Sequence, residues 1–139
     1  MQYRRSTYAE DAWDVYWYEK NLLGDVVAIY NSEGARVGRY LYSAYGATNV
    51  YNYATTTGQI TYSNPFRYRG YYYDPDIGLY YLQSRYYDPY TCRFISPDSV
   101  KYLGANGDLM SYNLYAYCSN NPVMYTDPTG TTTWGIVIF

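Results

Sequence analysis

Apolar and polar side chains alternate within the segment 26–42, which is the pattern of strands with one buried and one exposed face. The alternation is interrupted at Asn31-Ser32-Glu33-Gly34, where every residue tolerates a tight or left-handed backbone. The pattern therefore predicts a β-hairpin with strands over Val26–Tyr30 and Ala35–Tyr42. Gly34 is well placed for a bulge beside the turn.

Two weaker patterns flank this hairpin. Before it, aromatic residues and a β-branched valine favour a strand over Val15–Glu19, although the aromatic spacing also fits a helix. After it, the sequence predicts a second hairpin, with strands over Val50–Tyr53 and Gln59–Tyr62 joined by a loop at Thr55–Gly58.

The second half of the chain repeats the triplet Tyr-Asp-Pro, at Tyr73-Asp74-Pro75 and again at Tyr87-Asp88-Pro89. Aspartate accepts backbone hydrogen bonds in Asx-turns, proline restricts φ, and a nearby glycine supplies positive φ. We therefore predict a strand over Tyr68–Tyr73, a turn over Asp74–Gly78 and a strand over Leu79–Tyr87. The second triplet then ends the returning strand, so both triplets are primarily turn signals.

Beyond Asp98 the pattern is less regular and rich in turn-forming residues, with one helical turn predicted over Leu109–Tyr115. Residues 131–139 form a short apolar tail. No linker or block of charge divides the chain. The sequence therefore predicts one domain over 1–139, all-β and built of antiparallel hairpins, with a loop-rich or partly helical C-terminal part.

Composition narrows the function. The chain of 139 residues contains 25 tyrosines and no histidine, which excludes histidine triads, imidazole bases and histidine-containing zinc sites. Tyrosine has an apolar ring and a polar tip, so it suits sheets that are packed on one side and wet on the other. Cys92 and Cys118 are too few for a disulfide scaffold, and two unpaired thiols are the simpler expectation.

Charge and hydropathy predict no cofactor, no metal, no nucleic acid and no membrane span. The net charge is −2, so no basic field attracts nucleic acid. The turn acids Asp74 and Asp76 lack the spacing of a calcium loop. The chain starts without the apolar run of a secretory signal, and no segment approaches the length of a membrane-spanning helix. We expect a cytoplasmic protein, or one exported by a route other than Sec.

Two runs of sequence resemble the core domain of bacterial Rhs (YD-repeat) proteins. The first, "NPFRYRGYYYDPDIGLYYLQSRYYDPYTCRFISPD", is followed by "NLYAYCSNNPVMYTDPTG", and together they span about 64–130. Upstream, residues of about 22–46 look like one preceding tyrosine-aspartate repeat of the same family. The resemblance implies a ribbon of antiparallel hairpins that forms a patch of a curved shell around a C-terminal toxin.

The resemblance also implies an intramolecular aspartyl protease that releases the toxin after the leucine of an Asp-Pro-x-Gly-Leu motif. The residues that match the family's supporting arginine and aspartates are Arg85, Asp98 and Asp127. Two neighbouring carboxylates can share a proton, and a guanidinium can stabilise an oxyanion. Here Thr131 stands in place of the leucine. The alternative for the final motif is an ordinary turn.

Three functions follow from these patterns. The main interpretation is a structural shell or cap element of a truncated or orphan Rhs-type toxin-delivery protein, associating into a homo-oligomer or filament and holding a toxin segment or joining a longer shell. The first alternative is a self-cleaving aspartyl protease core. The second is a carbohydrate-binding module, in which exposed tyrosines stack on sugars beside the arginines Arg67, Arg69, Arg85 and Arg93.

Overall fold

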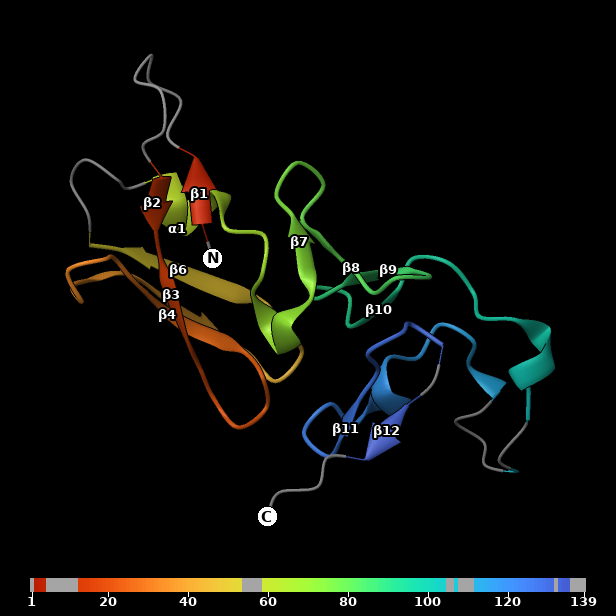
Figure 1. The fold of residues 1–139 in the computed structure, drawn as a ribbon. Coiled ribbons are helices and arrows are strands. Elements are labelled where there is room, and N and C mark those ends of the chain that lie inside the picture. The colour runs from red at the N-terminus through yellow and green to blue at the C-terminus, as the bar shows by residue number, and fades with distance from the viewer. Residues whose placement is uncertain are drawn as a thin grey trace. The chain divides into compact units, whose positions relative to one another are not determined.

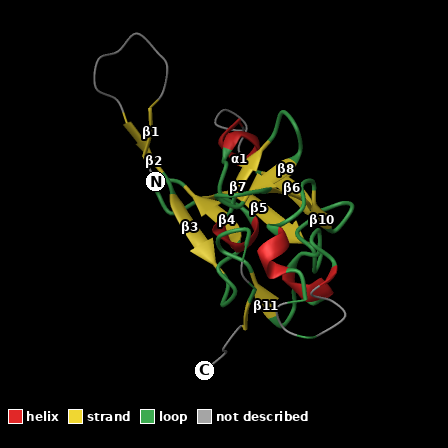
Figure 2. Ribbon diagram, turned by 90° about the vertical axis from the view of Figure 1, so that its right-hand side faces the viewer, coloured by secondary structure: helices red, strands yellow, loops and turns green. Residues whose placement is uncertain are grey.

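Antiparallel strands, turns and loops dominate the computed structural model, and the helices are few and short (Figures 1 and 2). The structure describes residues 2–4, 13–53, 59–104, 107, 112–131 and 133–135. These fall into an N-terminal unit (Met1–Leu41 and Thr48–Gly70) and a C-terminal unit (Tyr42–Ala47 and Tyr71–Phe139). The predicted all-β, antiparallel fold class is confirmed. The prediction of a single domain stays a prediction.

Hairpins build the N-terminal unit. A two-stranded sheet pairs β1 with β2, and a four-stranded sheet has the order β3-β4-β5-β6. The predicted strand over Val15–Glu19 divides at Tyr16, whose ring is buried. The strands are β1 (Gln2–Arg4), β2 (Trp13–Val15), β3 (Trp17–Lys20), β4 (Val26–Tyr30), β5 (Arg36–Tyr42) and β6 (Thr48–Asn52).

The hairpin predicted from the alternating pattern is confirmed as β4 and β5. Asn31 organises its turn, because the side-chain oxygen accepts hydrogen bonds from the backbone N–H groups of Glu33 (3.1 Å) and Ala35 (2.8 Å). Gly34 has a φ of 79°, and the pairing register shifts next to this turn, between Ile29 and Tyr30. The local turn chemistry thus determines the hairpin.

The second predicted hairpin is wrong. Strand β6 pairs with β5, and the segment expected to return beside it is the short helix α1 (Gln59–Ser63). Ile60 and Thr61 are consecutive and both buried, whereas a strand would direct them to opposite faces. The helix can pack closely against β5 because Gly38 has no side chain. A Cβ added at Gly38 would lie 2.4 Å from Thr61 Oγ1. The predicted loop at 55–58 lies outside the described residues.

A tight turn also replaces the start of the predicted strand over Tyr68–Tyr73. The 3-10 helix η1 spans Tyr68–Gly70, and the strand begins only at β7 (Tyr72–Asp74). Arg69 has a φ of 53°, and its backbone N–H donates to Asp25 Oδ1 at 2.7 Å. This long-range hydrogen bond, which local sequence does not reveal, explains the error.

The C-terminal unit contains a sheet of order β10-β9-β8-β7. Its turn after β7 is as predicted, with Asp74 Oδ1 accepting from Asp76 N at 3.0 Å. The predicted strand over Leu79–Tyr87 is instead a hairpin of β8 (Leu79–Tyr81) and β9 (Tyr86–Asp88). Gln83, with a φ of 63°, turns the chain between them. The turn was missed because it contains no glycine, proline or asparagine.

Tyrosines on neighbouring strands form the core of the C-terminal unit. Tyr80 pairs with Tyr73 on one side and with Tyr87 on the other, and Tyr87 pairs with Phe94 of β10 (Arg93–Phe94). The ring centroids of Tyr87 and Tyr117 lie 4.1 Å apart. Buried hydroxyls still find partners, since Tyr87 Oη donates to the carbonyl of Tyr45 at 2.7 Å.

The remaining described elements are short and joined by turns. They are the 3-10 helices η2 (Val100–Tyr102) and η4 (Cys118–Asn120) and the paired strands β11 (Tyr125–Thr126) and β12 (Trp134–Gly135). Residues 109–111 of the predicted helical turn lie outside the described residues. Cys92 and Cys118 form no disulfide. None of the helices in the described ranges has both the length and the apolar character needed to cross a bilayer.

Candidate functional site

A buried arginine occupies the turn between β8 and β9. Leu82 N donates to the carbonyl of Arg85 at 2.9 Å, and Ser84 N donates to the carbonyl of Leu82 at 2.7 Å. These two bonds close the turn and direct the Arg85 side chain into the C-terminal unit, where Arg85 is only 8 % exposed. A charged side chain in such a position requires several compensating partners.

Five groups surround the Arg85 guanidinium. Nη2 lies 2.8 Å from Asp98 Oδ2 and 4.0 Å from Asp127 Oδ2. Nη1 donates to the carbonyl of Leu114 at 2.9 Å, and Nε donates to the carbonyl of Gly130. The Phe94 ring completes the set, with its centroid 3.6 Å from Cζ. We call Arg85, Asp98, Asp127 and Gly130 the Arg85 cluster.

Burial and charge act on this arginine in opposite directions. Burial lowers the pKa of Arg85 below its ordinary value, whereas the carboxylates of Asp98 and Asp127 raise it. An arginine remains protonated in spite of such a shift. The cluster therefore holds a cation between two carboxylates and two backbone carbonyls.

The Asp127 carboxylate organises the loop that follows β11. Oδ1 accepts backbone N–H bonds from Thr129 (3.3 Å), Gly130 (2.8 Å) and Thr131 (3.2 Å). The backbone N–H of Asp127 donates to the hydroxyl of Tyr71 at 3.3 Å. Asp127 is 2 % exposed, so its charge depends on compensation by protein groups, among them these backbone donors and Arg85.

Gly130 lies where no other residue fits. Its φ is 74°, and a Cβ added there would lie 2.7 Å from both the Leu82 carbonyl oxygen and Ser84 Oγ. Ser84 Oγ in turn donates to the carbonyl of Thr129 at 2.6 Å. The Asp-Pro-Thr-Gly loop is thus held against the β8–β9 turn from both sides.

The three residues singled out from the sequence, Arg85, Asp98 and Asp127, are therefore brought together. Their catalytic role stays a prediction. Sequence reasoning missed Leu114, Phe94 and the hydroxyls around Asp127, because these partners come from distant segments. Gly130 was a usable signal of the loop, because a glycine that follows Asp-Pro-x commonly occupies a turn position with positive φ.

Three of the four arginines considered for sugar stacking have buried side chains, since the side chain of Arg69 is 4 % exposed. Arg67 is 5 % exposed and donates to the carbonyls of Asn64 (3.1 Å) and Tyr62 (2.6 Å). Arg85 belongs to the cluster described above. None of these three side chains can therefore present its guanidinium to a ligand at the surface, whereas Arg93 is exposed.

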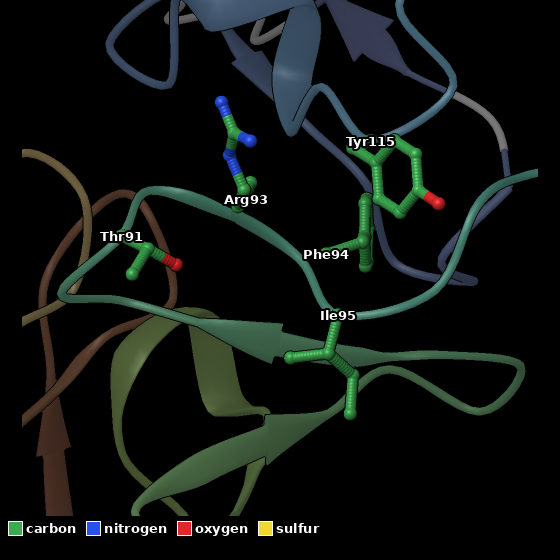
Figure 3. Close-up of a pocket in the computed structure, with 5 residues that line it drawn as sticks. All are labelled: Thr91, Arg93, Phe94, Ile95 and Tyr115. Carbon is green, nitrogen blue, oxygen red and sulfur yellow. The ribbon is translucent and has the colours of Figure 1, made fainter.

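Next to the cluster, a pocket of about 320 Å³ opens on the C-terminal unit (Figure 3). Phe94, which packs on Arg85, also lines the pocket, and in Figure 3 Arg93 and Ile95 point to opposite sides of the ribbon. The described residues contain no group of three metal-binding side chains. The lining residues are Thr91, Arg93, Phe94, Ile95 and Tyr115.

Comparison with known families identifies the fold. A model of the Teneurin YD-shell family matches residues 9–123. The chain belongs to this YD-shell family. The resemblance to Rhs (YD-repeat) proteins is confirmed by the same match and by bacterial toxins among its relatives.

The relatives of this chain include proteins named as a nuclease and as toxins. The tRNA nuclease WapA of Bacillus subtilis is 42% identical over 122 residues, covering 88% of this chain and 5% of the nuclease. The toxin subunit YenC2 of Yersinia entomophaga is 32% identical over 114 residues, covering 82% of this chain and 11% of that subunit. This chain thus spans only a small part of the length of these relatives.

Solved structures agree with the family assignment. The crystal structure of TcdB2-TccC3-Cdc42 matches with a TM-score of 0.72 and 30% sequence identity, over 91% of this chain and 6% of that one. The chain is therefore a YD-shell element of the kind found in toxin-delivery proteins, and its relatives include bacterial ones.

Proposed function

We propose that this chain is a structural element that forms part of the wall of a YD shell enclosing a toxin segment. The observation that carries the proposal is that the region matching the YD-shell family is a succession of antiparallel hairpins with buried tyrosines. Such a ribbon needs no catalytic group to perform its task. The toxin names of its relatives support a role in toxin delivery.

The proposal includes association through strand edges. Of the two four-stranded sheets, the one in the N-terminal unit has β3 and β6 as its outer strands, and the one in the C-terminal unit has β7 and β10. An outer strand presents backbone donors and acceptors that can pair with a further strand. We expect copies of the isolated chain to pair through such edges, as successive hairpins do within a longer shell.

Light scattering after size-exclusion chromatography tests this association. We expect particles well above the monomer mass of 16.3 kDa, and electron microscopy should show them as curved and hollow. Tyr51→Lys places a charge on the outer strand β6 and should shift the population toward monomer. Leu22→Lys, in an exposed turn, is the matched control. A uniform monomer would contradict self-association, and solid particles would contradict a wall.

A second candidate function is self-cleavage by the Arg85 cluster. The specific observation in its favour is the approach of Arg85 to Asp98 and Asp127, two carboxylates beside one guanidinium. Intact-mass spectrometry under denaturing conditions tests it, since a self-cleaving chain yields two pieces. Asp127→Asn should remain in one piece, whereas Asp14→Asn, a control outside the cluster, should cleave like the natural sequence.

A further inference from the structure

We propose that the bond broken in this chain is Gly130–Thr131, and that the Thr131 hydroxyl is the nucleophile in an N-to-O acyl shift. The proposal rests on the self-cleaving candidate function above and specifies its bond and chemistry. It differs from water attack after a leucine, since the position of that leucine holds a threonine. Four contacts around the Gly130–Thr131 peptide group support this chemistry.

The first contact polarises the carbonyl. Arg85 Nε donates to the carbonyl oxygen of Gly130, so the only guanidinium in the Arg85 cluster is directed at the carbonyl group of this peptide bond. Asp98 holds the guanidinium from the other side through Nη2 at 2.8 Å. A fixed cation at a carbonyl oxygen stabilises the negative charge that forms when the carbonyl carbon is attacked. Asp98 therefore acts as a positioning residue.

The second and third contacts lead a proton away from the nucleophile. Thr131 Oγ1 lies 3.1 Å from Thr129 Oγ1, and Thr129 Oγ1 lies 3.5 Å from Asp127 Oδ1. The two hydroxyls link the Thr131 side chain to a buried carboxylate. Because Asp127 is 2 % exposed, it exchanges protons with this chain of hydroxyls more readily than with bulk water.

The fourth contact supplies the proton to the leaving group. The backbone N–H of Thr131 donates to Asp127 Oδ1 at 3.2 Å, so the nitrogen that gains a proton when the carbon–nitrogen bond breaks lies beside the oxygen that ends the chain of hydroxyls. One carboxylate thus contacts both the group that loses a proton and the nitrogen that must gain one.

The proposed cleavage proceeds by an acyl shift followed by hydrolysis of the resulting ester. Thr131 Oγ1 bonds to the carbonyl carbon of Gly130, and its proton passes through Thr129 Oγ1 to Asp127. The carbon–nitrogen bond breaks, and Asp127 returns the proton to the Thr131 nitrogen, which becomes a free amine. An ester now joins Gly130 to Thr131 Oγ1. Water from the solvent hydrolyses this ester, leaving a carboxylate on Gly130 and a free hydroxyl on Thr131.

The products should stay associated until the protein is unfolded. Trp134 of β12 pairs with Thr126 of β11, and these two residues lie on opposite sides of the proposed cleavage point. The segment after Gly130 would therefore remain in its sheet. Cleavage must consequently be measured under denaturing conditions, because chromatography of the folded protein would not reveal it.

The test uses the full 139-residue chain and denaturing intact-mass spectrometry. We expect pieces of residues 1–130 and 131–139, with hydroxylamine trapping the ester as a hydroxamate on Gly130. Thr131→Ser should retain cleavage, and Thr131→Ala should abolish it. Arg85→Met should slow it about 100-fold or more. Thr133→Ala, outside the cluster, should cleave at the natural rate.

Two results would overturn the proposal, and they are distinguishable. Cleavage between positions 130 and 131 that persists in Thr131→Ala, or cleavage of the natural chain at a different bond, would refute the acyl shift and retain self-cleavage by another route. An intact natural chain that also gives no hydroxamate would refute both the acyl shift and the self-cleaving function. Circular dichroism of each variant separates lost chemistry from lost folding, and neither result affects the proposed shell function.

Discussion

Each of the two units buries an aspartate beside an arginine, yet the two pairs are built differently. In the N-terminal unit, Arg69 Nε lies 3.9 Å from Asp25 Oδ1, and the close donors to this carboxylate are the backbone N–H of Arg69 (2.7 Å) and Asn21 Nδ2 (2.6 Å). In the C-terminal unit, the guanidinium of Arg85 itself is the close partner, at 2.8 Å from Asp98.

The difference shows what a buried charge requires. A carboxylate that receives amide donors is compensated without a cation, so the guanidinium near Asp25 contributes little. Arg85 instead contacts two carboxylates, two carbonyls and an aromatic ring. Backbone N–H groups also donate to Asp98 and Asp127, but the guanidinium is the group that lies against both carboxylates and both carbonyls at once. The C-terminal unit should therefore be far more sensitive to loss of its arginine.

The strongest test of this comparison removes each arginine. Arg85→Met should lower the free energy of unfolding by about 3–5 kcal/mol, because the buried Asp127 and the half-buried Asp98 lose the cation that they share. Arg69→Met should cost about 1 kcal/mol, since the backbone N–H that binds Asp25 is retained. Urea unfolding followed by circular dichroism measures both, and equal losses would contradict the comparison.

Two glycines with similar backbone angles provide the next test. Gly34 in the N-terminal unit has a φ of 79° and open space around it, whereas a Cβ at Gly130 would lie 2.7 Å from the Leu82 carbonyl oxygen. We expect Gly34→Ala to cost about 1 kcal/mol through backbone strain alone. Gly130→Ala should cost about 3 kcal/mol, because it also displaces the β8–β9 turn. Thermal unfolding compares them, and a larger loss for Gly34→Ala would be inconsistent with the packing of this loop.

Removing a buried tyrosine hydroxyl should change the free energy of unfolding by a smaller amount, which differs between the two units. Tyr40 Oη donates to the carbonyl of Thr61 (2.5 Å) and accepts from Asn64 Nδ2 (3.3 Å), whereas Tyr87 Oη donates to the carbonyl of Tyr45 (2.7 Å). Tyr40→Phe should therefore cost about 2 kcal/mol and Tyr87→Phe about 1 kcal/mol. Urea titrations resolve this difference, and the reverse order would show that the hydroxyl partners do not determine the cost.

The smallest expected effect is a loss of stability at alkaline pH. Burial raises the pKa of Tyr18 from 10.0 to about 12, and it also raises the pKa of Tyr40 in the same unit. The folded state then holds the phenol proton more tightly than the unfolded state. The stabilisation is complete below pH 10 and is lost as the pH rises through about 12.

Melting curves from about pH 9, one unit below the ordinary tyrosine pKa, up to about pH 12, the raised pKa of Tyr18, measure this loss. Tyr18 is partly exposed, so solvent screens the effect, which we expect to be below about 1 kcal/mol. Tyr18→Phe should show a shallower alkaline decrease than the natural sequence. Tyr90→Phe, at an exposed position, is the control and should leave the decrease unchanged.

Elements that depend on interactions between residues close in sequence were predictable, and elements that depend on distant residues were not. The hairpin of β4 and β5 was predictable because strand alternation and an Asn-Ser-Glu-Gly turn are local properties. The helix α1 was not predictable, because it depends on the space that Gly38 leaves for Thr61 across more than twenty residues. The turn at Gln83 was missed because a residue that is neither glycine nor asparagine has a positive φ there.

The candidate site divides in the same way. Arg85, Asp98 and Asp127 were identified as candidate site residues because they match the family's motifs in their order along the chain. The carbonyl that receives Arg85 Nε and the hydroxyls that connect Thr131 to Asp127 depend on the fold. Without these contacts, Thr131 was only a departure from the expected leucine.

The sequence by itself determined the hairpin class, the turn positions with aspartate and glycine, and the family, because short-range backbone preferences and motif order are present in the chain before it folds. The tertiary structure decided which charges are compensated by cations, which glycine cannot be replaced, and which peptide bond faces the buried arginine. These outcomes depend on distances between segments far apart in sequence, which exist only once the core has formed.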